Sequence, residues 1–335
     1  MSADVPAAGQ KPCYFLVSVS THENLELCIR HALAGFPSGA SGAWTFCEIK
    51  EGDFVSFLYG AKAYNLYEVT RKEAIRAAEV LPPWKPLFFK ESGRTYSFPF
   101  RLHLRPIRVF VESLVRTEFS YVGENLLLRG GYRKTHFQAD QTTLQSVSEM
   151  GTRTYDSAVA LALPEYTTFT PRFTRSPKLV NTPEICRFNE TILQSAIRRY
   201  LMFEDNLQMF LARLNLAGMQ AGELEILGEK ALPQGHIDLL LKHRAPLGTA
   251  PKIPIEVKTN RGNAEDLSQL GGYMDELRGE CPIGVLVAAE FIKDAVSKAA
   301  DARITLVRYA LNVDLKKTPT FEQICQGVTL EPLGK

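Results

Sequence analysis

The amino-acid sequence predicts two domains of different fold class, an α+β domain followed by an α/β domain. A chain of 335 residues exceeds the size of one average domain and suits two. Residues 1–150 consist mainly of short segments typical of strands, which favours a small β-barrel with a few helices. Residues 184–335 alternate segments typical of helices and strands, which favours an α/β core with helices packed on a mixed central sheet.

The first half is dominated by β-branched and aromatic runs. Residues 14–20 form an apolar run typical of a buried strand, and residues 97–110 alternate apolar and basic side chains, as a half-exposed strand does. Residues 22–36 place apolar side chains at helical spacing. We therefore predict strands at 14–20, 52–60, 63–70 and 97–110, and helices at 22–36 and 137–150.

A connector, residues 151–183, joins the two halves. Its later part, residues 163–183, contains four prolines and five threonines and shows no helical period. Such a segment is either a linker between domains or an ordered strap over a domain surface. The domain boundaries are therefore expected at 1–150 and 184–335, on either side of this connector.

The second half begins with a long helical region. Residues 187–216 carry apolar side chains at the helical period, which predicts one broken helix or two consecutive helices. Three strands follow, and then helices alternate with strands in a layered order. The strands are predicted at 224–232, 236–243, 252–259, 281–289 and 304–311, and the helices at 264–279 and 291–302.

Composition indicates a cytoplasmic, globular protein. Hydrophobic residues make up 45% of the chain and charged residues 23%, and no apolar run approaches the ~18 residues that span a bilayer. The first residues lack the apolar and basic regions of a secretory signal. The six cysteines show neither CxxC nor Cys/His metal spacing, so we expect reduced thiols rather than disulfides or a zinc site.

Basic residues are concentrated between Trp84 and Lys134. This stretch holds ten Lys and Arg against four Glu, a local excess of six, although the net charge of the whole chain is only +2. The excess indicates either a surface that contacts phosphates or the solvated outer face of a strand-rich domain.

Three charged residues on two adjacent predicted strands suggest a catalytic centre. Glu256 and Lys258 are two residues apart on one strand and therefore project from the same face. Asp238 lies on the preceding strand and meets them if the two strands pair. Two buried carboxylates side by side are costly unless a cation or proton offsets their repulsion. The alternative is an edge strand with charges on its solvent face.

A hard divalent cation suits such carboxylates. Mg²⁺ binds oxygen ligands and retains several waters, and Mn²⁺ is expected to substitute for it. The metal would activate a water molecule and neutralise charge on a phosphodiester. Lys258 would orient the nucleophile or stabilise the transition state.

The same region resembles the PD-(D/E)XK nuclease superfamily, in particular RecB-type nucleases and the archaeal mismatch and flap endonucleases. The similarity covers residues 203–280, and four ordered motifs carry it. They are an acidic residue on the helix before the strands, called here the helix acid (Glu204), a Gly235-His236-Ile237-Asp238 turn, the Glu256-Val257-Lys258 strand and a helix with Gln269 and Tyr273. The resemblance implies a catalytic set of Asp238, Glu256, Lys258, Glu204, Gln269 and Tyr273, with metal bound by Asp238, Glu256 and Glu204.

Each of these assignments has a plain structural alternative. Glu204 is otherwise a solvated helix residue, and Glu190 is a second candidate for the helix acid. Gln269 and Tyr273, one helical turn apart, otherwise only cover the sheet. His236 stands where the family has an arginine, which puts that phosphate contact in doubt, since histidine is mostly uncharged at neutral pH.

Residues 12–150 resemble PUA-like modules of the EVE and YTH type. The likeness rests on the strand from Tyr14, the Gly52-Asp53 strand, the Trp84-Lys85-Pro86-Leu87 segment and the closing residues 126–144. It implies an aromatic pocket for a flipped modified base, since base faces stack on aromatic rings. Aromatic core filling is the alternative, and Asp53 is expected to fix its turn. The expected pocket residues are Trp44, Trp84, Tyr59 and Tyr64, with Trp44 in the glycine- and serine-rich segment 38–46, which is expected to be an exposed loop. The expected phosphate contacts are Arg129, Arg133 and Lys134.

Together the two resemblances imply a modification-dependent DNA endonuclease. The first domain would flip a modified base while the second hydrolyses phosphodiesters with Mg²⁺. One active site cuts one strand, so double-strand cleavage predicts a homodimer. The alternatives are a structure- or mismatch-specific DNA repair endonuclease and a catalytically silent DNA- or RNA-binding protein.

Overall fold

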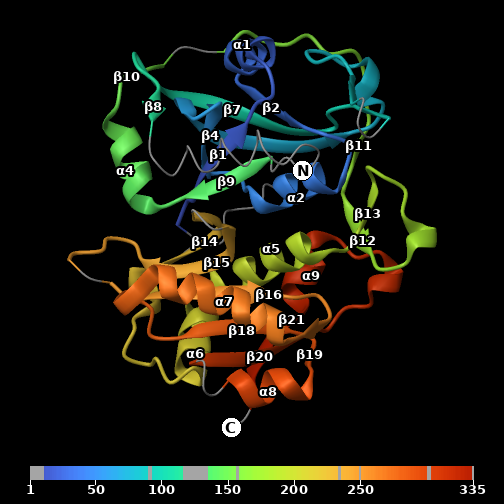
Figure 1. Cartoon of the computed structure of the whole chain (residues 1–335). Helices are drawn as coiled ribbons and strands as arrows, with labels where there is room; N and C mark the ends of the chain where they lie inside the picture. The colour runs from blue at the N-terminus through green and yellow to red at the C-terminus, as the bar shows by residue number, and fades with distance from the viewer. Residues whose placement is uncertain are drawn as a thin grey trace.

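The computed structural model forms two lobes, one above the other (Figure 1). It describes residues 11–89, 93–115, 135–155, 158–232, 235–248, 250–299 and 303–333. The first half of the chain forms the upper lobe and the second half forms the lower lobe. Both lobes contain helices and strands, so the mixed α/β character predicted from the sequence is confirmed.

The upper lobe is built on a nine-stranded sheet. Its main path runs β10-β7-β4-β3-β1-β9, with β2 beside β7 and with β8 and β11 beside β4. Within the described ranges, β9 and β10 are the ends of this path and do not pair with each other, so closure into the predicted barrel is not observed. The strands are β1 (Tyr14–Ser18), β2 (Leu33–Phe36), β3 (Phe54–Tyr59), β4 (Lys62–Ile75), β7 (Phe100–Val109), β8 (Leu114–Val115), β9 (His136–Ala139), β10 (Thr152–Arg153) and β11 (Thr168–Phe169), and β5 (Leu87–Phe89) pairs separately with β6 (Arg94–Tyr96).

The first helix of this lobe is shorter than the apolar spacing indicated. α1 (His22–His31) ends because Ala32 adopts the left-handed conformation, with φ 42°. The following residues, predicted to continue the helix, instead pair with β7 as strand β2. Apolar spacing does not by itself separate a helix end from a short buried strand.

The predicted helix at 137–150 likewise begins with a strand. Residues up to Ala139 form β9, which pairs with β1, and α4 (Gln141–Glu149) starts after Asp140. The Asp140 carboxylate caps this helix by accepting a hydrogen bond from the backbone N–H of Thr143. The strand and helix are therefore separated at a capping residue.

A segment expected to be an exposed loop is a buried helix. α2 (Ala40–Glu48) contains Trp44, whose side chain is buried. Gly42 allows the close approach of this helix to the preceding turn, because a Cβ at that position would lie 1.9 Å from the carbonyl oxygen of Pro37. The glycine- and serine-rich composition suggested a loop, whereas tertiary packing makes the segment helical.

The connector is an ordered strap. β11 pairs with β4, and the Tyr166 hydroxyl donates to Glu73 Oε2 over 3.0 Å. Further along, Arg76 Nε lies 2.6 Å from Glu184 Oε1. The second of the two interpretations of this segment is therefore correct. Another strand of the connector, β12 (Arg172–Thr174), pairs in parallel with β13 (Ile185–Arg187), which follows the connector.

The lower lobe contains a six-stranded mixed sheet in the order β14-β15-β16-β18-β20-β21. The pairs from β16 to β20 are parallel and the others are antiparallel. All predicted elements of this half are present, and the helical region at 187–216 forms two helices, whereas α9, β17, β19 and β21 were not predicted. The elements are α5 (Glu190–Leu201), α6 (Glu204–Arg213), β14 (Leu224–Leu232), β15 (Gly235–His243), β16 (Lys252–Val257), β17 (Arg261–Gly262), α7 (Ala264–Leu277), β18 (Gly284–Ala288), β19 (Glu290–Phe291), α8 (Lys293–Ala299), β20 (Ile304–Leu311), α9 (Phe321–Gly327) and β21 (Val328–Pro332).

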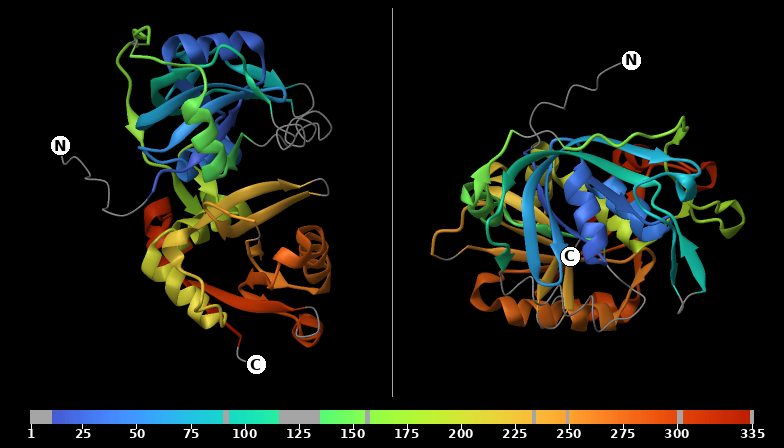
Figure 2. Two further views of the ribbon diagram at one scale, coloured as in Figure 1. Left: turned by 90° about the vertical axis from the view of Figure 1, so that its left-hand side faces the viewer. Right: turned by 90° about the horizontal axis from the view of Figure 1, so that it is seen from above.

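Helices cover both faces of this sheet. Figure 2 shows α6 (yellow) and the orange helices α7 and α8 on opposite sides of the strands. Along β18, Val285 and Val287 join a core that also includes residues of α5 and of the upper lobe, whereas Leu286 packs with residues of α7 and α8. The two faces of one strand therefore serve two different cores.

The two lobes share a packed, partly charged interface. The α2 helix of the upper lobe contacts α5 of the lower lobe, as Figure 1 shows. Glu48 forms a buried ion pair with Arg198, and Trp44 Nε1 donates to Ser195 Oγ over 2.8 Å. These contacts link the upper lobe directly to a helix of the lower core.

All six cysteines are free thiols. Burial raises the pKa of the Cys13 thiol to about 11 and that of Cys28 to about 12. These groups are therefore protonated and poorly nucleophilic at neutral pH. Across the described part of the chain, no helix is both long and apolar enough to cross a membrane.

Candidate active site

Asp238 and Glu256 lie side by side on adjacent strands, as the spacing predicted. The β15–β16 register pairs Leu239 with Ile255, so the next position along brings Asp238 opposite Glu256. Asp238 Oδ2 accepts a hydrogen bond from the backbone N–H of Val257 over 2.8 Å. This side-chain contact anchors Asp238 to the strand that carries Glu256.

Both carboxyls are in an environment that disfavours their charge. Glu256 is 1% exposed, and its Oε2 has no hydrogen-bond partner among the described residues. Burial raises the pKa of Asp238 well above its ordinary value, and the Glu256 carboxylate raises it further. Burial also raises the pKa of Glu256, against the opposing effect of Lys258. The pair of carboxyls therefore favours the binding of a proton or a cation.

Lys258 supplies one positive charge at this centre. Its Nζ lies 2.7 Å from Glu256 Oε1, 3.5 Å from Glu190 Oε1 and 3.9 Å from Asp266 Oδ1. Burial lowers its pKa, but the hydrogen bond to Glu256 and the nearby carboxylates outweigh this effect and hold the pKa above its ordinary value. These contacts therefore favour the charged form of Lys258.

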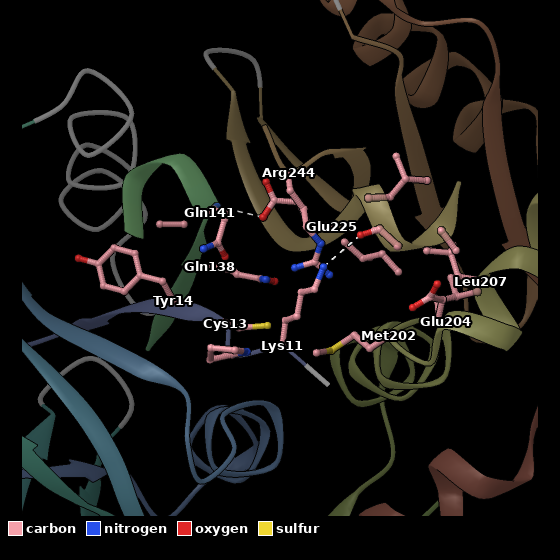
Figure 3. A pocket seen from close by; sticks show the side chains of 17 residues that line it. Lys11, Cys13, Tyr14, Gln138, Gln141, Met202, Glu204, Leu207, Glu225 and Arg244 are labelled. Carbon is pink, nitrogen blue, oxygen red and sulfur yellow. Dashed lines mark hydrogen bonds between the residues drawn. The ribbon is translucent and has the colours of Figure 1, made fainter. Parts of the chain in front are cut away.

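The helix acid at the centre is Glu190 and not Glu204. Glu190 is the first residue of α5, where its carboxylate approaches Lys258. Glu204 is the first residue of α6, and its carboxylate lies against Gly222. There it lines a different cavity of about 50 Å³ between the lobes, together with Lys11 (Figure 3). The prediction that Glu204 joins the metal-binding set is therefore wrong.

Gln269 and Tyr273 lie where the sequence pattern placed them. Gln269 Nε2 donates to Tyr273 Oη over 3.1 Å, and Tyr273 Oη donates to the His236 carbonyl oxygen over 2.9 Å. Burial raises the pKa of Tyr273, and the charges of Glu256 and Asp238 raise it further. Tyr273 therefore supports the start of β15 next to the acidic pair.

His236 faces the upper lobe. Its ring stacks on Phe137 of β9, with ring centroids 6.1 Å apart. His236 therefore contributes to packing between the lobes. The resemblance to PD-(D/E)XK nucleases had implied an arginine and a phosphate contact at this position.

Asp266 is a charged neighbour that the sequence pattern did not reveal. It is buried in the first turn of α7, where its Oδ2 accepts from the backbone N–H of Asn263 in a capping box. Its Oδ1 faces Lys258. The Asn263-x-x-Asp266 spacing was the available signal, but a capping pattern alone does not reveal a nearby lysine.

The donor set of this centre fits a hard divalent cation. The buried Glu256 oxygen without a hydrogen-bond partner and the Asp238 carboxylate are oxygen ligands of the type that Mg²⁺ prefers. No group of three or more His, Cys, Asp or Glu side chains gathers as a metal cluster in the described residues. A cation here would therefore rely on few protein ligands together with water or substrate oxygens, as Mg²⁺ often does.

The tryptophans predicted for a base pocket are buried in packed surroundings. Trp44 is 5% exposed, and its indole N–H donates a hydrogen bond to Ser195 Oγ. Trp84 is 6% exposed and lies so close to Gly35 that a Cβ there would be 2.4 Å from its ring. The guanidinium carbon of Arg101 lies over this indole, 5.5 Å from the ring centroid. The interpretation as core aromatics is therefore correct for both.

Tyr59 and Tyr64 are half-buried and pack against the same core. Asp53 fixes its turn as expected, since its carboxylate accepts from the backbone N–H groups of Cys13 and Lys50, each over 2.8 Å. The three expected phosphate contacts, Arg129, Arg133 and Lys134, lie outside the described residues.

Comparisons with known proteins find no matching family model and no matching curated protein. Solved structures with a partial likeness include the EndoMS–dsDNA2 complex, at 22% identity and TM-score 0.21 over 24% of this chain and 36% of that one. A repair endonuclease from Pyrococcus abyssi is similar at 18% identity and TM-score 0.23 over 30% and 43% of the two chains. The DNA modification-dependent restriction endonuclease AspBHI is similar at 17% identity and TM-score 0.21 over 82% and 62%. This chain spans less than two thirds of each solved chain, and TM-scores this low do not assign a function.

Proposed function

We propose that the chain is a metal-dependent endonuclease that hydrolyses phosphodiesters of DNA. The observation that carries the proposal is the pairing of Asp238 with a buried Glu256 beside the cation Lys258. Such a pair is costly without a partner, and an active site is where a protein tolerates that cost. The order of the surrounding motifs, which resembles the PD-(D/E)XK pattern, supports the same conclusion.

Each residue has a role that follows from its position. Asp238 and Glu256 would hold Mg²⁺, which when bound supplies an activated water and neutralises phosphate charge. Lys258, whose contacts favour its charged form, would stabilise negative charge that develops on the phosphate oxygens. Glu190 lies across from Glu256 at Lys258 and keeps that ammonium between the two carboxylates. Tyr273 orients the backbone that leads into Asp238.

A more specific proposal is that cleavage depends on a modified base, which the upper lobe recognises. Its support is the resemblance to PUA-like modules and the direct attachment of that lobe to α5, the helix that carries Glu190. With Trp44 and Trp84 in the packed core, Tyr59 and Tyr64 are the remaining candidates for contact with the base. A homodimer for double-strand cleavage belongs to the same proposal.

The test is cleavage of a plasmid panel. Supercoiled plasmids without modification, or with methyladenine, methylcytosine or hydroxymethylcytosine, are incubated with the purified chain in Mg²⁺, Mn²⁺ or EDTA. We expect cutting of a modified plasmid in either metal and none in EDTA. Asp238→Asn should lower the rate by at least about 100-fold, whereas Asp205→Asn, an exposed control on α6, should leave it unchanged.

The other outcomes separate the alternatives. Equal cutting of every plasmid removes the dependence on modification. Preferential cutting of flap or mismatched substrates favours a repair endonuclease. Retained DNA or RNA binding without cutting in any metal indicates a catalytically silent binding protein and overturns the proposal.

A further inference from the structure

Arg175 of the strap lies beside the candidate centre. Its Nη2 donates to Tyr309 Oη over 3.1 Å and to the Thr259 carbonyl oxygen over 3.4 Å. Its guanidinium carbon lies 5.5 Å from the centroid of the Phe188 ring. Three neutral groups therefore hold the guanidinium in place while the residue as a whole remains exposed.

The residues that Arg175 contacts are neighbours of the acidic centre. Thr259 follows Lys258 in the chain, and its carbonyl also accepts from Tyr309 Oη over 2.6 Å. Burial raises the pKa of Tyr309, Arg175 lowers it, and Glu190 raises it again, so both charged groups lie near this hydroxyl. Arg175 is thus on the side of the centre where Glu190 approaches Lys258.

The charge of Arg175 has no carboxylate partner among the described residues, and its Nε and Nη1 donors have no hydrogen-bond acceptor there. Several other exposed arginines are paired with acids. Arg76 pairs with Glu184, and Arg261 pairs with Glu290. A positioned guanidinium with spare donors next to a phosphodiester-cleaving site suits a phosphate oxygen, which accepts two parallel N–H bonds from arginine.

We propose that Arg175 binds a backbone phosphate of the nucleic-acid strand that enters the candidate centre. The inference rests on the proposed nuclease function and adds to it a residue from the strap. It also provides the cationic phosphate contact that is missing at His236, whose ring stacks on Phe137. A phosphate contact of this kind positions the strand and carries no sequence information.

The experiment compares Arg175→Gln with Arg172→Gln. Arg172 is an exposed arginine of the same strap, and its side chain donates to the Thr318 carbonyl oxygen instead. Binding of a short fluorescent DNA duplex is measured in Ca²⁺ over a series of salt concentrations, and cleavage is measured in Mg²⁺. We expect Arg175→Gln to raise Kd by about tenfold and to reduce the slope of log K against log salt by about one. Arg172→Gln should stay within about twofold of wild type.

Two more variants separate phosphate binding from a structural role. Arg175→Lys keeps the charge, so it should restore most of the salt slope while losing part of the affinity. Tyr309→Phe removes the hydroxyl that holds the guanidinium, so it should raise Kd without changing the salt slope.

The inference is overturned if wild type binds and cuts DNA while Arg175→Gln retains its Kd and salt slope. It is equally overturned if Arg175→Gln and Arg172→Gln weaken binding by the same factor. If wild type binds DNA but cuts nothing, the nuclease function fails, and the effect of Arg175→Gln on the salt slope still decides whether Arg175 contacts phosphate.

Discussion

At the scale of single residues, the centre is defined by one lysine among three carboxylates. Lys258 faces Glu256, Glu190 and Asp266, and its pKa is held above the ordinary value. A lysine that stays charged cannot accept the proton of an attacking water. In the proposed reaction its contribution would then be electrostatic, and the proton would pass to a carboxylate or to solvent.

The placing of Glu190, rather than Glu204, at the centre can be tested directly. Glu190→Gln removes the carboxylate beside Lys258, so we expect the cleavage rate to fall by about tenfold to 100-fold. Glu204→Gln is the matched control, because this glutamate is also the first residue of a helix but lies against Gly222. Rates are measured in Mg²⁺ with the substrate that wild type cuts best. A larger loss in Glu204→Gln than in Glu190→Gln would contradict the assignment.

The candidate site was partly predictable from residue spacing. Asp238, Glu256 and Lys258 were found because alternation along a strand assigns side chains to a face. Gln269 and Tyr273 were found because four residues make about one helical turn. Glu204 was chosen over Glu190 because it lies within residues 203–280, the stretch that carries the family resemblance, whereas which glutamate reaches the sheet depends on packing.

At the scale of elements, α5 connects the lobes. Its first residue, Glu190, approaches Lys258, while Ser195 and Arg198 further along the helix contact α2 of the upper lobe. Arg198 is 1% exposed, so its charge depends on the buried carboxylate of Glu48. A change at this contact is therefore expected to act on the position of the whole helix.

Replacing Glu48 tests this link. Glu48→Gln keeps the shape but leaves the Arg198 guanidinium buried without an opposite charge, so the free energy of unfolding should fall by about 3 kcal/mol. Ser195→Ala removes the acceptor of the Trp44 indole and a neutral hydrogen bond to Glu48 but leaves the ion pair in place, so it should cost only about 1 kcal/mol. Both are measured by urea denaturation. Equal, small losses in the two variants would show that the ion pair does not support the interface.

At the scale of the whole molecule, a second charged contact joins the lobes, and one of its members, Glu225, also lines the cavity in Figure 3. Lys242 of β15 lies 2.9 Å from Asp140, which caps α4, and 3.0 Å from Glu225 of β14. Burial raises the pKa of Asp140, but the hydrogen bonds from Thr143 and the charge of Lys242 outweigh it and lower the pKa below the ordinary value of 3.8. A lowered carboxyl pKa means that the contribution to stability is present above pH 3.8 and is lost as the pH falls further.

Asp140→Asn should therefore show a pH-dependent loss of stability. Asparagine keeps a side-chain cap for α4 but removes the charge that faces Lys242, so we expect a loss of about 2 kcal/mol at neutral pH. The difference from wild type should shrink as the pH falls below 3.8, which urea denaturation at several pH values can follow. Asp314→Asn is the control, because Asp314 also caps a short helix and forms no ion pair within the described ranges. A difference that stays constant with pH would contradict the role of the charge.

The sequence by itself determined the mixed helix-and-strand character of the chain, the order of nearly all elements in the lower lobe and the placing of Asp238 beside Glu256 and Lys258. These depend on local periodicity and on strands adjacent in the chain, which short-range spacing specifies. Only the tertiary structure decided that Trp44 is buried against Ser195, that Glu190 is the helix acid, and that Arg175 reaches the centre. Each of these contacts joins segments far apart in the chain, and spacing along one segment carries no information about which distant surface it meets.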